Sequence, residues 1–125
     1  MQESGGNYLE TIYLLQKEGK DVHSVDVARA LGFSKPSVSR AMGLLKDAEY
    51  IEVAKNGVIT LTKSGQKKAK ELSDKEDLIV KFLMMTTDVK QEVAEKEASK
   101  MKHFIQNETV KGIKSFIKQV EEYEE

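Results

Sequence analysis

The sequence predicts a mainly α-helical fold with a small β-hairpin wing, divided into residues 1–72 and a C-terminal helical segment, residues 73–125. Apolar residues recur at three- and four-residue spacing through most of the chain, which is typical of amphipathic helices. Two short helices joined by a Gly-containing turn lie between residues 24 and 45, and two short apolar runs flank Asn56-Gly57. Together these features predict an N-terminal winged helix-turn-helix.

Glycines and capping residues place the first three helices. Gly19 ends the first helix, and Ser24 is expected to cap the second, which stops at Gly32. Ser34 is expected to cap the third, whose first turn holds Pro36 where a missing N–H is tolerated. The predicted helices span residues 7–18, 24–31 and 35–45.

The hairpin and the remaining helices follow from turn chemistry and apolar spacing. Asn56-Gly57 predicts a two-residue type I′ turn, and Thr62 is expected to cap a Lys-rich helix that begins at Lys63 and ends at Leu72. The apolar spacing after Ser73 predicts only helices. The predicted strands are residues 50–53 and 58–61, and the later helices are residues 74–87, 88–105 and 108–121.

The composition favours a binding protein over an enzyme. The chain has 125 residues, a net charge of −1, 33% charged and 39% hydrophobic residues, which predicts a soluble, cytoplasmic globular protein with no membrane segment. It has no Cys and two His, so a cysteine nucleophile is excluded and imidazole chemistry is limited. Neither a Gly-rich phosphate loop nor a His-Glu-x-x-His pair occurs. We therefore expect that the protein is not an enzyme.

The third helix and the hairpin carry residue types suited to double-stranded DNA. Polar and basic residues of this helix fall opposite Val38, Met42 and Leu45, so they would face base edges and phosphates in the major groove. Two alternatives stay open: a solvated surface, and a protein-interaction module without DNA readout. The predicted DNA-binding residues are Lys35, Pro36, Ser37, Ser39 and Arg40 in the helix, Lys55 and Asn56 in the hairpin, and Lys63 and Lys67 beyond it.

The segment after Ser73 predicts a homodimer. Its apolar stripes exceed what one thin helical layer can cover, so a second copy is expected to bury them. A two-fold dimer would place its recognition helices on a pseudo-palindromic operator. The expected interface includes some of Phe82, Met85, Phe104, Ile105, Phe116 and Ile117.

Four segments resemble a known family: residues 7–13 (NYLETIY), 25–31 (VDVARAL), 35–40 (KPSVSR) and 61–65 (LTKSG). They are similar to the iron- and manganese-dependent repressors, the diphtheria toxin repressor and manganese transport regulator group. This resemblance implies a transcriptional regulator, by analogy a repressor, that binds palindromic operators as a homodimer. It also implies manganese or iron(II) as the effector, although no cofactor follows from the residues themselves.

The resemblance implies metal ligands, but several of these positions hold unsuitable residues. An ammonium cannot bind a metal while it stays protonated, so Lys102 is the strongest departure. Three possibilities stay open: Lys102 replaces the metal as an internal cation that ties Glu10 to Glu76, an altered metal site persists, or the residues form a solvated helix face. The possible ligands are Glu10, Glu76, Glu95 and His103, whereas Asn7, Val80, Ser99 and Lys102 oppose a normal site.

Overall fold

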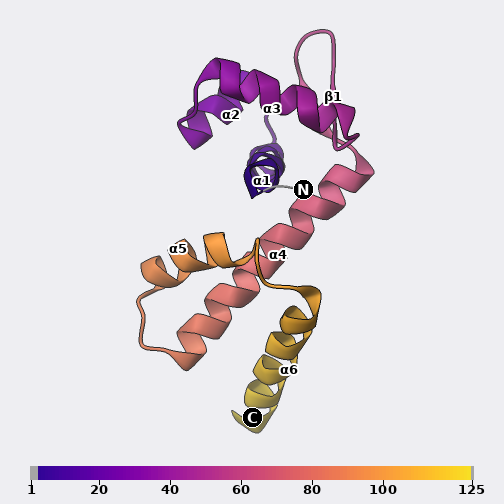
Figure 1. The fold of residues 1–125 in the computed structure, drawn as a ribbon. Helices are drawn as coiled ribbons and strands as arrows, with labels where there is room; N and C mark the ends of the chain where they lie inside the picture. The colour runs from indigo at the N-terminus through magenta and orange to yellow at the C-terminus, as the bar shows by residue number, and fades with distance from the viewer. Residues whose placement is uncertain (1–2, 125) are drawn as a thin grey trace. The chain divides into compact units, whose positions relative to one another are not determined.

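The computed structural model describes residues 3–124 and divides into two compact units, Met1–Glu71 and Leu72–Glu125, called here the N-terminal and C-terminal units. Helix α4 crosses the division, so that its residues 63–71 belong to the first unit and the others to the second. The elements in chain order are α1 (Glu3–Lys17), α2 (Ser24–Leu31), α3 (Lys35–Asp47), β1 (Ile51–Val53), β2 (Ile59–Leu61), α4 (Lys63–Thr86), α5 (Gln91–Met101) and α6 (Asn107–Glu124) (Figure 1).

The N-terminal unit is a winged helix-turn-helix, as predicted. Helices α1, α2 and α3 pack against one another, and the hairpin contacts α1 through β2 and α3 through β1. Apolar residues from all of these elements form one core, which explains why two short helices and a two-stranded hairpin are stable together. The most deeply buried members are Leu9, Ile12, Val22, Val27, Val38, Ile51 and Ile59.

The start of α2 differs from the prediction, because His23 and not Ser24 is the N-cap residue. The backbone of His23 is extended, and Ser24 is already helical. The Asp26 carboxylate accepts a 2.8 Å hydrogen bond from the His23 backbone N–H, which satisfies a donor at the helix start. The helix ends as expected at Gly32, whose φ is 69°.

The hairpin loop also differs from the predicted type I′ turn. That turn needs positive φ at both central residues, but Gly57, with φ of 87°, is the only loop residue of positive φ. The Ala54 carbonyl accepts from the Gly57 N–H at 2.9 Å, and the Ala54 N–H donates to the Val58 carbonyl at 2.9 Å. The loop is therefore three residues long, with a turn followed by a left-handed glycine.

Strand pairing fixes the hairpin in the N-terminal unit. The strands are antiparallel, with Ile51 opposite Leu61 and Val53 opposite Ile59. Ile59 also donates its N–H to the Val22 carbonyl at 2.8 Å, so the segment before α2 adds an isolated bridge to β2. The base of the wing is thus joined by backbone hydrogen bonds to the helix-turn-helix.

The predicted helix boundaries after the hairpin need correction. Helix α4 continues through Ser73, because serine costs only a few tenths of a kcal/mol in a helix and neither Gly nor Pro interrupts it there. Helix α5 starts at Gln91, not at Asp88, and ends at Met101. At the other end of the chain, α1 begins four residues before the predicted start, at Glu3.

The C-terminal unit is built from the rest of α4 with α5 and α6. Its buried residues include Ile79 of α4, Ala94 and Ala98 of α5, and Ile113 and Ile117 of α6. The rings of Phe82 and Phe116 join α4 to α6 in an edge-on contact with centroids 5.8 Å apart. No helix within residues 3–124 has both the length and the apolar character needed to cross a membrane.

Candidate nucleic-acid interface and metal-ligand positions

Helix α3 has one buried face and one exposed polar face. Val38, Met42 and Leu45 are 0%, 4% and 5% exposed and hold the helix on the core. The opposite side is open to solvent, so donors there can reach a ligand without any change in the fold. The five predicted DNA-binding residues of this helix, Lys35, Pro36, Ser37, Ser39 and Arg40, are all exposed.

The predicted cap at the start of α3 is confirmed, and it also orients a serine hydroxyl. Ser34 Oγ accepts from the Ser37 N–H at 3.3 Å and donates to Ser37 Oγ at 2.9 Å. Ser37 Oγ therefore accepts a hydrogen bond from Ser34, and its own hydroxyl hydrogen is left to donate elsewhere. Pro36 lies in the first turn, as expected.

The hairpin tip presents Lys55 and Asn56 to solvent. Asn56 Oδ1 accepts from the Val58 N–H at 3.2 Å, so the amide carbonyl holds the loop while the NH₂ group can donate to an outside acceptor. Lys55 adds a positive charge at the same tip. Both predicted wing residues thus have free surface at the end of the hairpin.

A hydrogen-bond network that the sequence reasoning missed joins the turn between α3 and β1 to the start of α4. Thr62 Oγ1 accepts from the Gly65 N–H at 3.1 Å, which confirms the predicted cap, and donates to the Glu49 carbonyl at 2.7 Å. Ser64 Oγ donates to that carbonyl at 3.1 Å, and Glu49 itself has a φ of 64°. The Thr62-x-Ser64 spacing is the sequence signal from which this network could have been predicted. The network positions the first turn of α4, where Lys63 and Lys67 are exposed.

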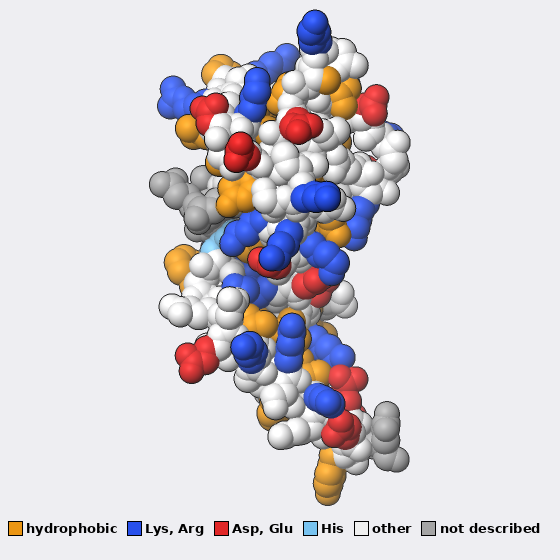
Figure 2. Space-filling model, turned by 90° about the vertical axis from the view of Figure 1, so that its right-hand side faces the viewer, with side chains coloured by type: hydrophobic (Ala, Val, Ile, Leu, Met, Phe, Trp, Pro, Cys, Tyr) orange, Lys and Arg blue, Asp and Glu red, His pale blue; other side chains and the backbone are white. Residues whose placement is uncertain are grey.

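On the face that Figure 2 draws, neither sign of charge dominates. Figure 2 shows acidic and basic side chains interspersed on the face that it draws. A ligand that approached this face would therefore meet local basic residues and not a broad positive field.

In the C-terminal unit, Lys102 pairs with Glu76. Lys102 is the C-cap residue of α5, and its Nζ lies 3.1 Å from Glu76 Oε1 on α4. The Lys102 side chain is 5% exposed and that of Glu76 is 29% exposed. Two of the predicted site residues are thus brought together, as an ion pair.

The other possible ligands lie on α5, after it, and on α1. Glu95 is exposed on α5, and its Oε1 accepts from Gln91 Nε2 of the same helix at 2.9 Å. His103 follows Lys102 and is half-buried, while Glu10 is buried on α1 of the N-terminal unit.

The donor set of the C-terminal unit does not fit a divalent metal ion. Lys102 offers an ammonium, which only donates, and this ammonium already pairs with the Glu76 carboxylate. In the part of the chain that the structure describes, no three or more His, Asp or Glu side chains are gathered where they could hold a metal.

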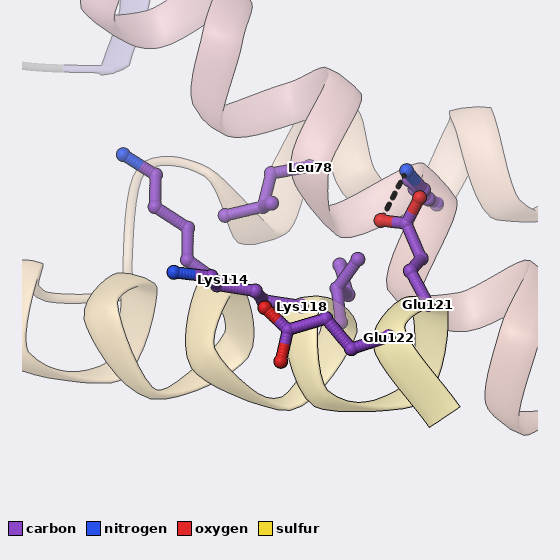
Figure 3. Close-up of a pocket in the computed structure, with 7 residues that line it drawn as sticks. Leu78, Lys114, Lys118, Glu121 and Glu122 are labelled. Atoms are coloured by element: carbon purple, nitrogen blue, oxygen red, sulfur yellow. Dashed lines mark hydrogen bonds and ion pairs between the residues drawn. The ribbon is translucent and has the colours of Figure 1, made fainter. Parts of the chain in front are cut away.

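A groove between α4 and α6 lies on the C-terminal unit. It encloses about 390 Å³ and is lined by Leu78, Ile117 and a charged rim (Figure 3). Across the rim, Lys81 Nζ and Glu121 Oε1 form an ion pair of 3.0 Å. The charged lining residues are Lys81, Lys114, Lys118, Glu121 and Glu122.

The residues expected at a dimer interface differ in exposure. Phe104 and Phe116 are 74% and 42% exposed, whereas Ile117 is 5% exposed and lies in the core of its own unit. Met85 is exposed, and Phe82 and Ile105 are half-buried. The aromatic members therefore offer most of the free apolar surface in this set.

Two family models cover almost the whole chain. The model of the iron-dependent repressor N-terminal DNA-binding domain matches residues 1–59, and that of the iron-dependent repressor metal-binding and dimerisation domain matches residues 62–124. The chain is 30% identical over 110 residues to the transcriptional regulator MntR of Escherichia coli O157:H7, covering 88% of this chain and 70% of that protein. It is also 30% identical over 118 residues to an uncharacterised HTH-type transcriptional regulator of Methanocaldococcus jannaschii, covering 94% of each.

Solved structures share the fold. The manganese regulator SloR superposes with a TM-score of 0.82 at 26% identity, covering 91% of this chain and 53% of that one. The metal-dependent transcriptional regulator MtsR gives a TM-score of 0.85 at 20% identity, covering 94% of this chain and 55% of that one. The chain thus spans about half the length of these two solved relatives.

Proposed function

Because the chain belongs to the iron-dependent repressor family, we propose that it is a transcriptional regulator that binds double-stranded DNA through α3 and the hairpin wing. Its relatives are transcriptional regulators, which favours gene control over catalysis. Repression by occupying a promoter is the simplest mode, because a bound dimer blocks access to the DNA beneath it.

The exposed polar face of α3 carries this proposal. Arg40 can donate two parallel hydrogen bonds to a guanine, and Ser37 and Ser39 can donate to bases or phosphates nearby. Lys55 and Asn56 at the wing tip, with Lys63 and Lys67 on α4, supply contacts to the phosphate backbone. The buried side of α3 keeps Arg40 and the two serines on a rigid support.

Assembly as a homodimer is the second part of the proposal. The C-terminal unit matches a dimerisation domain and leaves Phe104 and Phe116 exposed. Two copies related by a two-fold axis would present two α3 helices to half-sites about 34 Å apart, or a multiple of that. The operator is therefore expected to be pseudo-palindromic.

The test begins by selecting bound duplexes from a random double-stranded oligonucleotide library. Fluorescence anisotropy then compares the selected duplex with a scrambled one at two salt concentrations. Arg40→Ala is expected to cost about 1–3 kcal/mol on the selected duplex and to relax preference at one base pair of each half-site. Lys111→Ala, on an exposed position of α6, removes one positive charge as the matched control.

The outcomes separate DNA readout from a protein-interaction module. DNA binding must weaken steeply as salt rises, because phosphate contacts release counterions. If no duplex is enriched, or if Arg40→Ala and Lys111→Ala bind equally well, the proposed role of α3 is wrong. A winged helix that binds another protein would then be the better interpretation.

A further inference from the structure

A buried lysine at the end of α5 is the feature that the proposed function leaves unexplained. Lys102 is 4% exposed, and its ammonium donates a 3.1 Å hydrogen bond to Glu76 Oε1. Burying an ammonium is costly unless a carboxylate and further hydrogen bonds compensate for the lost water. The position of Lys102 just after the last turn of α5 also favours a positive charge, because helix carbonyls converge there.

A second lysine strengthens the same connection. Lys75 lies on α4 next to Glu76, and its Nζ donates a 2.7 Å hydrogen bond to the Ile105 carbonyl. The two lysines together join α4 to residues 102–105, the turn between α5 and α6. This turn is therefore held by two cationic groups that belong to the chain itself.

The Lys102 ammonium and a divalent cation would compete for Glu76. Two positive charges next to one carboxylate repel each other, and the ammonium offers no lone pair to a metal. Glu95, the remaining carboxylate of the candidate set on α5, already accepts from Gln91 on its exposed surface. A metal bound to Glu76 would therefore have to break the Lys102–Glu76 pair, and Glu95 would have to leave Gln91 before it could act as a ligand.

We propose that Lys102 is an internal cation that takes the place of a divalent metal in the C-terminal unit, so that folding of this unit and DNA binding need no added metal. The part that concerns DNA rests on the proposed function, whereas the part that concerns metal does not. The matched family domain is described as metal-binding, so this chain would differ from its family in this property.

The first experiment measures metal binding without DNA. Purified protein is stripped with chelator, and manganese(II) and then iron(II) are titrated by calorimetry and in thermal melts. No saturable binding and no change in Tm are expected. A metal present at a hundred times its Kd would raise Tm by on the order of 10 °C, and such a rise with saturable binding would overturn the proposal.

The second experiment measures affinity for the selected duplex with chelator and with added manganese. The proposal predicts the same Kd in both, within about twofold, and a Kd at least tenfold tighter with manganese would overturn it. If no duplex binds in either condition, the proposed function fails, and the metal titration still decides the inference about Lys102.

A variant series tests the ion pair itself. Lys102→Met should lower Tm by several degrees, because it leaves Glu76 without the ammonium, whereas the control Lys100→Met, at an exposed position of α5, should leave Tm unchanged. The double variant Glu76→Gln with Lys102→Met should recover part of the loss. Equal Tm values for Lys102→Met and Lys100→Met would refute an internal cation.

Discussion

Replacing Gly65 by alanine should destabilise the N-terminal unit, although alanine favours helices. A Cβ at this position of α4 would overlap the Tyr50 carbonyl oxygen and lie 2.9 Å from the carbonyl carbon and 3.3 Å from Leu61 Cδ2. The optimal separation of two carbons is about 3.5–4.0 Å, so either the backbone at Tyr50 or the start of α4 must move. Because the Tyr50 carbonyl also accepts from the Thr62 N–H at 3.0 Å, the movement would disturb both this bond and the Thr62 cap.

The expected magnitude is about 2–4 kcal/mol of lost unfolding free energy. Overpacking costs about 1–3 kcal/mol and each disturbed hydrogen bond about 1 kcal/mol, while the helix propensity of alanine returns about 1 kcal/mol. Urea unfolding followed by far-UV circular dichroism measures the change. Gly43→Ala in α3 is the control, since nothing lies within 4 Å of its Cβ position, and it should gain up to about 1 kcal/mol. A Gly65→Ala protein as stable as wild type would refute this account of the wing and α4.

Three further predictions address affinity, backbone strain and assembly. Lys67→Ala should weaken binding to all duplexes about equally and reduce the salt slope by roughly one unit, as loss of a phosphate contact does; a loss confined to the selected duplex would contradict this role. Glu49→Gly should raise the unfolding free energy by about 1 kcal/mol in urea titrations, because Glu49 has a φ of 64°, and a lower stability would show that its side chain matters more than its backbone. Phe104→Ser should shift sedimentation from dimer to monomer without changing the monomer fold, since this ring is 74% exposed; an unchanged dimer would remove Phe104 from the interface.

The helix-turn-helix was predictable because local chemistry and burial agree there. Ser34, Pro36 and Gly32 mark the turn and the start of α3, and the apolar spacing of Val38, Met42 and Leu45 matches the face that is buried. Such agreement between cap, turn and periodicity leaves few alternatives. The class of the N-terminal unit therefore followed from the sequence.

Several details could not be predicted, because they depend on competition between neighbouring groups. Asp26 shifts the N-cap of α2 to His23, and a single glycine of positive φ turns the expected two-residue loop into one of three residues. Ser73 has a side chain typical of a helix cap but lies within α4. The small helix-propensity cost of serine is less than the free energy gained by keeping the helix unbroken there. Lys102 and Glu76 are far apart in the sequence, so the charge pattern suggested an ion pair between them but could not show that the two side chains meet.

A cation on a lysine side chain is made together with the protein, whereas a metal ion has to be taken up from the growth medium. If Lys102 acts as proposed, the ion is present at one per chain from the moment of synthesis, and it can neither be diluted nor exchanged for a competing element. Occupancy of the promoter would then follow the number of protein copies in the cell. Control would move from the uptake of an ion to the synthesis and degradation of the regulator, and starvation for manganese or iron would leave its output unchanged.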